Sequence, residues 1–171
     1  MFLALEMPAD VRSRLAGWTT AAVGARDGVR AVPEPSLHIT LVFLGSTPAA
    51  DVRGIWTAAS EAAAGTAAPA LAGAGLVALP RRRPRVFALQ LEDHGGRAAD
   101  LHQSVAGALD AGEGRPWLPH VTLARVAKDA RMVSLDTEAP VVEPFQAPAM
   151  SLMRSHPGSR YELVERLELD C

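Results

Sequence analysis

The sequence carries one short motif twice, and this repeat constrains the fold more than any other feature. The two copies read HITL at residues 38–41 and HVTL at residues 120–123. Only five of the 171 residues are histidine, so composition alone does not explain two such copies. Successive side chains of a β-strand point to opposite faces. Each histidine therefore shares a strand face with its threonine, and the two pairs could converge on one cleft.

The spacing of apolar and turn-forming residues predicts a mixture of strands and helices. Helices are expected near residues 8–23, 48–61 and 97–110, with a break at 112–114. Strands are expected at 2–6, 38–44, 71–79, 85–91, 120–125, 150–154 and 161–169. The last two strands are joined by the turn at 157–159, which predicts a hairpin. Residues 62–70 are rich in alanine and glycine and are expected to form a loop.

The order strand, helix, histidine-bearing strand occurs twice, at residues 2–44 and again at 86–125. Phe2 precedes His38 by 36 positions, and Val86 precedes His120 by 34. Similar spacing indicates two halves of like architecture. We therefore expect one domain, residues 1–171, built from two lobes that each contribute one His-x-Thr strand.

Composition limits the classes of function and partner. The formal net charge is −2, which argues against nonspecific nucleic-acid binding by the whole surface. Cys171 is the only cysteine, so no disulfide can form within the chain. Residues 1–5 form an apolar stretch too short for a signal peptide or a membrane span. We expect a cytoplasmic monomer that does not associate with a membrane.

Two imidazoles with two hydroxyls suit general acid–base catalysis at phosphorus. Imidazole titrates near pH 6.5, so a neutral ring can accept a proton while a charged ring donates one. The hydroxyls of Thr40 and Thr122 can donate hydrogen bonds to non-bridging phosphate oxygens. Arg125 lies five residues after His120 and could bind the same phosphate through two N–H groups.

Two other interpretations of the motif remain open. A zinc site needs three or four ligands, yet neither strand carries Asp, Glu or Cys close to His38 or His120. Alternatively, both histidines could be buried core residues and both threonines ordinary strand residues. The duplication of the motif makes this purely structural interpretation the weaker one.

Several residues outside the motifs have two plausible roles. Phe43 shares the strand parity of the core residues, so a core position is its default, although at a strand end it could stack on a base. Trp117 carries the same ambiguity. The basic run at residues 81–85 is either a solvated loop or a contact for an RNA backbone. The remaining histidines, His94, His102 and His156, are expected to be solvated.

Taken together, these stretches resemble the RNA 2′,3′-cyclic phosphodiesterases, also called the 2′-5′ RNA ligase family, of the 2H phosphoesterase superfamily. The match spans nearly the whole chain. It is carried by FLAL at 2–5, LHITLVFLG at 37–45, PRV at 84–86, RP at 115–116, PHVTLAR at 119–125, SLMR at 151–154 and YE at 161–162.

The resemblance implies a bilobal α+β fold in which antiparallel sheets face a central cleft and helices lie outside. It implies hydrolysis of a 2′,3′-cyclic phosphate to a 2′-phosphomonoester without a metal or other cofactor. By motif position, His38 would be the proton donor and His120 the proton acceptor, while Thr40, Thr122 and Arg125 would hold the phosphate. The substrate would be an RNA 3′ end or a small cyclic nucleotide.

Two alternatives to this activity stay open at the level of sequence. The chain could act mainly as a 2′-5′ RNA ligase, which is the reverse reaction with a ribose hydroxyl in place of water. It could also bind nucleotides or RNA ends without turnover, if one proton-transfer step were missing.

Overall fold

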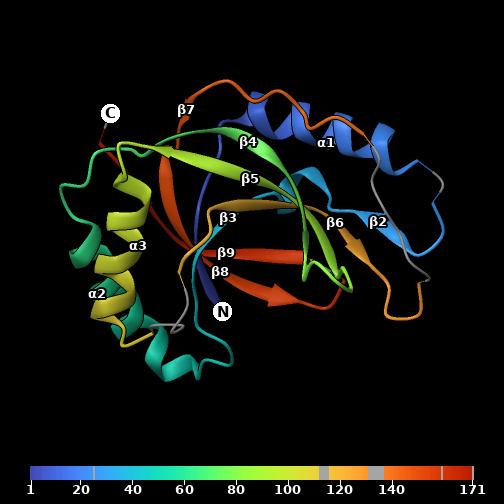
Figure 1. The fold of residues 1–171 in the computed structure, drawn as a ribbon. Coiled ribbons are helices and arrows are strands. Elements are labelled where there is room, and N and C mark those ends of the chain that lie inside the picture. Colours follow the sequence, from blue (N-terminus) through green and yellow to red (C-terminus); the bar gives the residue numbers. More distant parts are fainter. Residues whose placement is uncertain (25, 112–115, 131–136, 159, 171) are drawn as a thin grey trace.

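A computed structural model describes residues 1–171 except 25, 112–115, 131–136, 159 and 171 (Figure 1). Within the described residues the helices are α1 (Ala9–Val23), α2 (Val52–Ala63) and α3 (Arg97–Ala108), with short 3₁₀ turns at Glu34–Ser36 and Ala49–Asp51. The strands are β1 (Phe2–Leu5), β2 (Val29–Ala31), β3 (Ile39–Phe43), β4 (Ala70–Leu79), β5 (Val86–His94), β6 (His120–Val126), β7 (Phe145–Gln146), β8 (Ala149–His156) and β9 (Arg160–Glu168).

The sheet is antiparallel and its strand order has an internal symmetry. The order is β7-β4-β5-β6-β3-β1-β8-β9, and β2 pairs with β6 beside this path. From the central β6–β3 pair outward, β5 corresponds to β1, β4 to β8 and β7 to β9. The predicted two halves are therefore confirmed. They are hydrogen-bonded into one curled sheet rather than two separate ones, because β3 pairs with β6 at Ile39 and Val121.

The helices lie outside the curl of the sheet, α1 on one side and the α2–α3 pair on the other (Figure 1). The main hydrophobic core includes Val11 and Leu15 of α1, Leu101 and Val105 of α3, and Leu41 of β3. The spacing of four residues within each helix places these side chains on one helical face. Burial of this side of the sheet leaves the opposite, concave side for the polar residues of the motifs. No helix in the described part of the chain has the length and apolar character needed to cross a bilayer.

Most predicted elements are present, and the differences are local. The short strands β2 and β7 were not predicted, because two or three residues show no periodic pattern. The predicted hairpin of β8 and β9 is present, although residue 159 of its turn lies outside the described residues. The predicted break at 112–114 also falls there.

Candidate active site

Pairing between β3 and β6 brings the two motifs together. Ile39 and Val121, the residues between histidine and threonine in each motif, are register partners and are both fully buried. When this antiparallel register is carried one residue in each direction, His38 lies beside Thr122 and Thr40 beside His120. All four then share the face opposite Ile39 and Val121. The backbone positions of diagonal neighbours such as the two histidines lie about 7–8 Å apart, so both imidazoles border the same small region of this face.

Each motif ends in an irregularity at its leucine. The β1–β3 ladder pairs Ala4 with Thr40 and Leu3 with Val42, so it passes over Leu41. The β5–β6 ladder pairs Ala88 with Thr122 and Phe87 with Ala124, so it passes over Leu123. Such a β-bulge places two consecutive side chains on one side of the strand and reverses the alternation beyond it.

The bulges explain the positions of Phe43 and Arg125. Strict alternation would place both side chains on the core face, together with Leu41 and Leu123. After the bulge, Val42 and Ala124 occupy the core instead. Phe43 is 59% exposed, so its default assignment to the core is wrong. Arg125 is also exposed, on the side of the sheet that carries the motif histidines.

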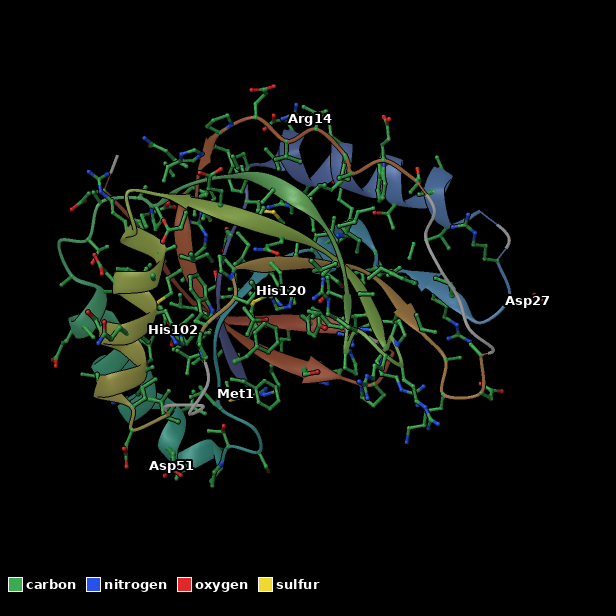
Figure 2. All side chains as sticks on the ribbon, in the orientation of Figure 1. Met1, Arg14, Asp27, Asp51, His102 and His120 are labelled. Atoms are coloured by element: carbon green, nitrogen blue, oxygen red, sulfur yellow. The ribbon has the colours of Figure 1, made fainter. Side chains whose placement is uncertain are left out.

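Both histidines are held by the same local hydrogen bond. His38 Nδ1 lies 2.8 Å from the carbonyl oxygen of Ser36, and His120 Nδ1 lies 2.8 Å from that of Leu118. A carbonyl can only accept, so Nδ1 must carry the proton and donate it. Each Nε2 is therefore the ring nitrogen left to exchange a proton. His120 lies inside the curl of the sheet (Figure 2).

The surroundings of the two imidazoles differ despite this symmetry. The ring of His38 stacks on Phe2, with 4.7 Å between the centroids, and the edge of Tyr161 approaches it at 4.9 Å. The pKa of His38 is lowered to about 4, mainly by burial. The hydrogen bond to the Ser36 carbonyl raises the pKa, whereas the charges of Arg125 and His120 lower it. His38 is therefore neutral at pH 7 in the substrate-free protein.

Tyr161 links Arg125 to this aromatic group. Arg125 donates a hydrogen bond from Nη2 to the hydroxyl oxygen of Tyr161 at 3.1 Å, while the Tyr161 ring contacts both His38 and Phe2. The guanidinium group is thereby held next to the imidazole. Phe2 and Tyr161 were not predicted as site residues, because β1 and β9 contact the motif only through tertiary structure. Their only sequence signal was that they fall in stretches carrying the family resemblance.

A cavity of about 810 Å³ opens next to His120 and Thr40. Its walls include Phe43, Trp117 and His102, and the last two rings are stacked 5.1 Å apart. Trp117 donates a hydrogen bond to the carbonyl oxygen of Thr40. His102 Nδ1 donates one to the carbonyl oxygen of Leu41, the bulge residue. The expectation that His102 is solvated is therefore wrong, since its ring forms part of the wall. The volume is typical of a small-molecule site.

The remaining predicted residues are placed as follows. Thr40 and Thr122 are both half-buried, next to the histidines as the register requires. His94 is exposed at the end of β5, as expected. His156 is exposed but contacts Glu162 through Nε2 at 2.9 Å. Among the described residues, no group of three or more His, Cys, Asp or Glu side chains is placed to hold a metal ion.

Comparisons with known proteins agree with this fold. The family model described as the 2'-5' RNA ligase superfamily matches residues 8–156, whereas no curated protein matches. The crystal structure of TT0787 of Thermus thermophilus is similar, with a TM-score of 0.80 and 26% identity, over 98% of this chain and 96% of that one. E. coli LigT complexed with 3'-AMP has a TM-score of 0.72 and 22% identity, over 98% of this chain and 96% of that one. The predicted fold class is therefore confirmed.

Proposed function

The chain belongs to the 2'-5' RNA ligase superfamily, and on this premise we propose that it hydrolyses a 2′,3′-cyclic phosphate at an RNA or nucleotide end. The product is a 2′-phosphomonoester, and the proton transfers need no metal. The observation that carries the proposal is the β3–β6 register. It supports a site in which two imidazoles, each with its tautomer fixed by a backbone carbonyl, flank one phosphate.

The phosphate is bound by side chains from both halves of the sheet. Thr40 and Thr122 donate hydrogen bonds to its two non-bridging oxygens, where negative charge grows in the transition state. Arg125, oriented by Tyr161, adds a charge-assisted contact. These interactions strengthen as the phosphorus becomes five-coordinate, so they favour the transition state over the substrate.

Two proton transfers complete the reaction. His120 accepts a proton from water at Nε2 while the water oxygen forms a bond to phosphorus. The bond from phosphorus to the 3′ oxygen breaks, and His38 donates its Nε2 proton to that oxygen. In-line displacement requires the entering and leaving oxygens on opposite sides of phosphorus, which a diagonal pair of histidines provides. His120 ends charged and His38 neutral, and exchange with solvent restores both.

The low pKa of His38 couples its role as an acid to substrate binding. In the free protein its pKa is about 4, first because of burial and then because of Arg125 and His120. A bound phosphate anion favours the imidazolium form and also offsets the charge of Arg125. Burial strengthens this attraction, because the Coulomb energy rises as the effective dielectric constant falls. We therefore expect His38 to take up a proton when the cyclic phosphate binds.

The cavity beside His120 suits the base of the terminal nucleotide. Phe43 is the most exposed aromatic wall, and Trp117 lies in the same cavity. Aromatic side chains stack on any base, so this site selects a nucleotide without demanding one sequence. The relative LigT has been crystallised with 3'-AMP and with ATP, which supports a nucleotide in the corresponding region here.

The proposal is tested by incubating the protein with a 2′,3′-cyclic nucleotide and EDTA and resolving the products by phosphorus NMR. We expect the 2′-phosphomonoester alone. A 3′-phosphomonoester would reverse the assignment of the leaving oxygen. Absence of any product between pH 5 and 8 would refute the hydrolase and leave the ligase and the binding protein as alternatives.

A substrate with an activated leaving group assigns the two histidines. A 3′-deoxynucleoside 2′-(p-nitrophenyl phosphate) keeps the 2′ ester and carries the aryl group in place of the 3′ oxygen. It loses p-nitrophenolate, which departs without a proton, so loss of the acid matters little. We expect His38→Ala to lose far more activity on the cyclic substrate than on the aryl ester. His120→Ala should lose activity on both. The opposite pattern would exchange the two roles.

A further inference from the structure

Three consecutive arginines at the tip of the β4–β5 hairpin have no role in the site described above. Arg81, Arg82 and Arg83 are all exposed. None of their side chains has a hydrogen bond or ion pair with another described residue. By contrast, the neighbouring Arg85 donates a hydrogen bond to the carbonyl oxygen of Ala127. Residues 81–83 are here called the Arg81–Arg83 loop. Their three guanidinium groups are therefore available to an external partner.

The hairpin begins and ends at the candidate active site. Leu79 and Pro80, which precede the loop, line the cavity together with Thr40 and His120. Val86, which follows it, is the register partner of Arg125. The loop therefore extends from the rim of the site, next to the arginine that contacts the phosphate in our proposal. Its positive charge is local, because the whole chain has a net charge of −2.

We propose that the Arg81–Arg83 loop binds backbone phosphates of a single-stranded RNA whose cyclic 3′ end occupies the active site. This inference rests on the proposed function and assigns to these three residues the contact with the RNA strand that precedes its cyclic end. Arginine is suited to this contact because its planar donors match phosphate oxygens. The strand must be unpaired at this end, since its last base enters the cavity beside His120.

The expected salt dependence of RNA binding by this loop follows from counterion release. Binding of single strands weakens with salt with a slope of about 0.7 per phosphate neutralised. Three phosphates give a slope of about 2, or a roughly fifteenfold loss of affinity between about 50 and 200 mM salt. A mononucleotide reaches only the active site and should not show this part of the salt dependence.

The test compares an octaribonucleotide ending in a 2′,3′-cyclic phosphate with the matching cyclic mononucleotide. For the parent protein, we expect kcat/KM to be higher for the octamer at low salt and to fall more steeply as salt is added. The variant in which Arg81, Arg82 and Arg83 are all replaced by glutamine should lose the preference for the octamer, and its octamer-to-mononucleotide ratio should no longer fall about fifteenfold between about 50 and 200 mM salt. A control that replaces Arg14, Arg26 and Arg53 by glutamine removes the same charge elsewhere and should keep the parent ratio.

Binding measurements keep this inference separate from the hydrolase proposal. Fluorescence anisotropy with a labelled 3′-phosphorylated octamer reports binding whether or not the protein turns over. Weaker binding by the Arg81–Arg83 variant alone supports the loop contact, even if the parent hydrolyses neither substrate. Equal binding and equal salt slopes for the parent, the loop variant and the control would overturn it.

Discussion

The burial of His38 predicts a measurable dependence of stability on pH. In the folded protein the pKa of His38 is about 4, lowered from 6.5 chiefly by burial and also by Arg125 and His120. Between these two values the unfolded chain holds a proton on this imidazole that the folded chain does not. Stability therefore rises with pH through this window and is constant above it as far as His38 is concerned.

The size of the effect follows from the two pKa values. One pKa unit corresponds to about 1.4 kcal/mol. Linkage then gives a loss from His38 of about 2 kcal/mol between pH 7 and 5, and about 3 kcal/mol by pH 4. This is a large fraction of the stability of an ordinary domain.

Urea denaturation of the parent and of His38→Asn at pH 7, 6, 5 and 4 measures this difference. Asparagine keeps an N–H group that can donate to the Ser36 carbonyl but does not titrate. Lost packing against Phe2 lowers the stability of the variant by the same amount at every pH, so it cancels from the slope. We expect the parent to lose about 2 kcal/mol more than the variant between pH 7 and 5. The control His94→Asn, at an exposed position, should follow the parent. Parallel curves for the parent and His38→Asn would refute the buried, neutral imidazole.

Three further predictions concern activity. The pH profile of kcat/KM reports groups of the free protein, so it should be bell-shaped with its acidic limb near pH 4, the pKa of His38 there; absence of a limb near pH 4 would contradict the burial effect. Tyr161→Phe removes the acceptor of the Arg125 hydrogen bond but keeps the ring, so kcat/KM should fall about tenfold or more. The acidic limb should stay below about 6.5, because burial is the main cause of the low pKa of His38; an unchanged kcat/KM would show that Arg125 needs no such support. Phe43→Ala should raise KM for a cyclic nucleotide about tenfold while inhibition by inorganic phosphate stays constant. Leu163→Ala removes a comparably exposed side chain from β9 and serves as its control; equal KM values for the two variants would exclude base stacking on Phe43.

The sequence was sufficient to predict the chemistry-bearing strands and the internal repeat. Alternation placed His38 with Thr40 and His120 with Thr122, and the repeated spacing predicted two like halves. Both follow from local patterns that a strand must satisfy to bury one face. The register pair of Ile39 and Val121 is the tertiary contact that turns the two patterns into one candidate site.

What the sequence did not reveal depends on irregular or long-range structure. Leu41 and Leu123 are ordinary strand residues, and nothing in them marks a bulge, yet the bulges decide the direction of Phe43 and Arg125. Tyr161 reaches His38 from a strand more than a hundred positions away, so no local pattern reports the contact. These interactions give His38 surroundings that the motif alone does not predict.

The central claim is that two imidazoles act on one phosphate, and a double-variant experiment tests it most directly. Hydrolysis of a 2′,3′-cyclic nucleotide in EDTA is measured for the parent, His38→Ala, His120→Ala and the double variant. We predict that each single change lowers kcat by about 10²- to 10⁴-fold. The double variant should lose much less than the product of the two, because both groups serve the same step. Activity within a few-fold of the parent in either single variant would contradict the account.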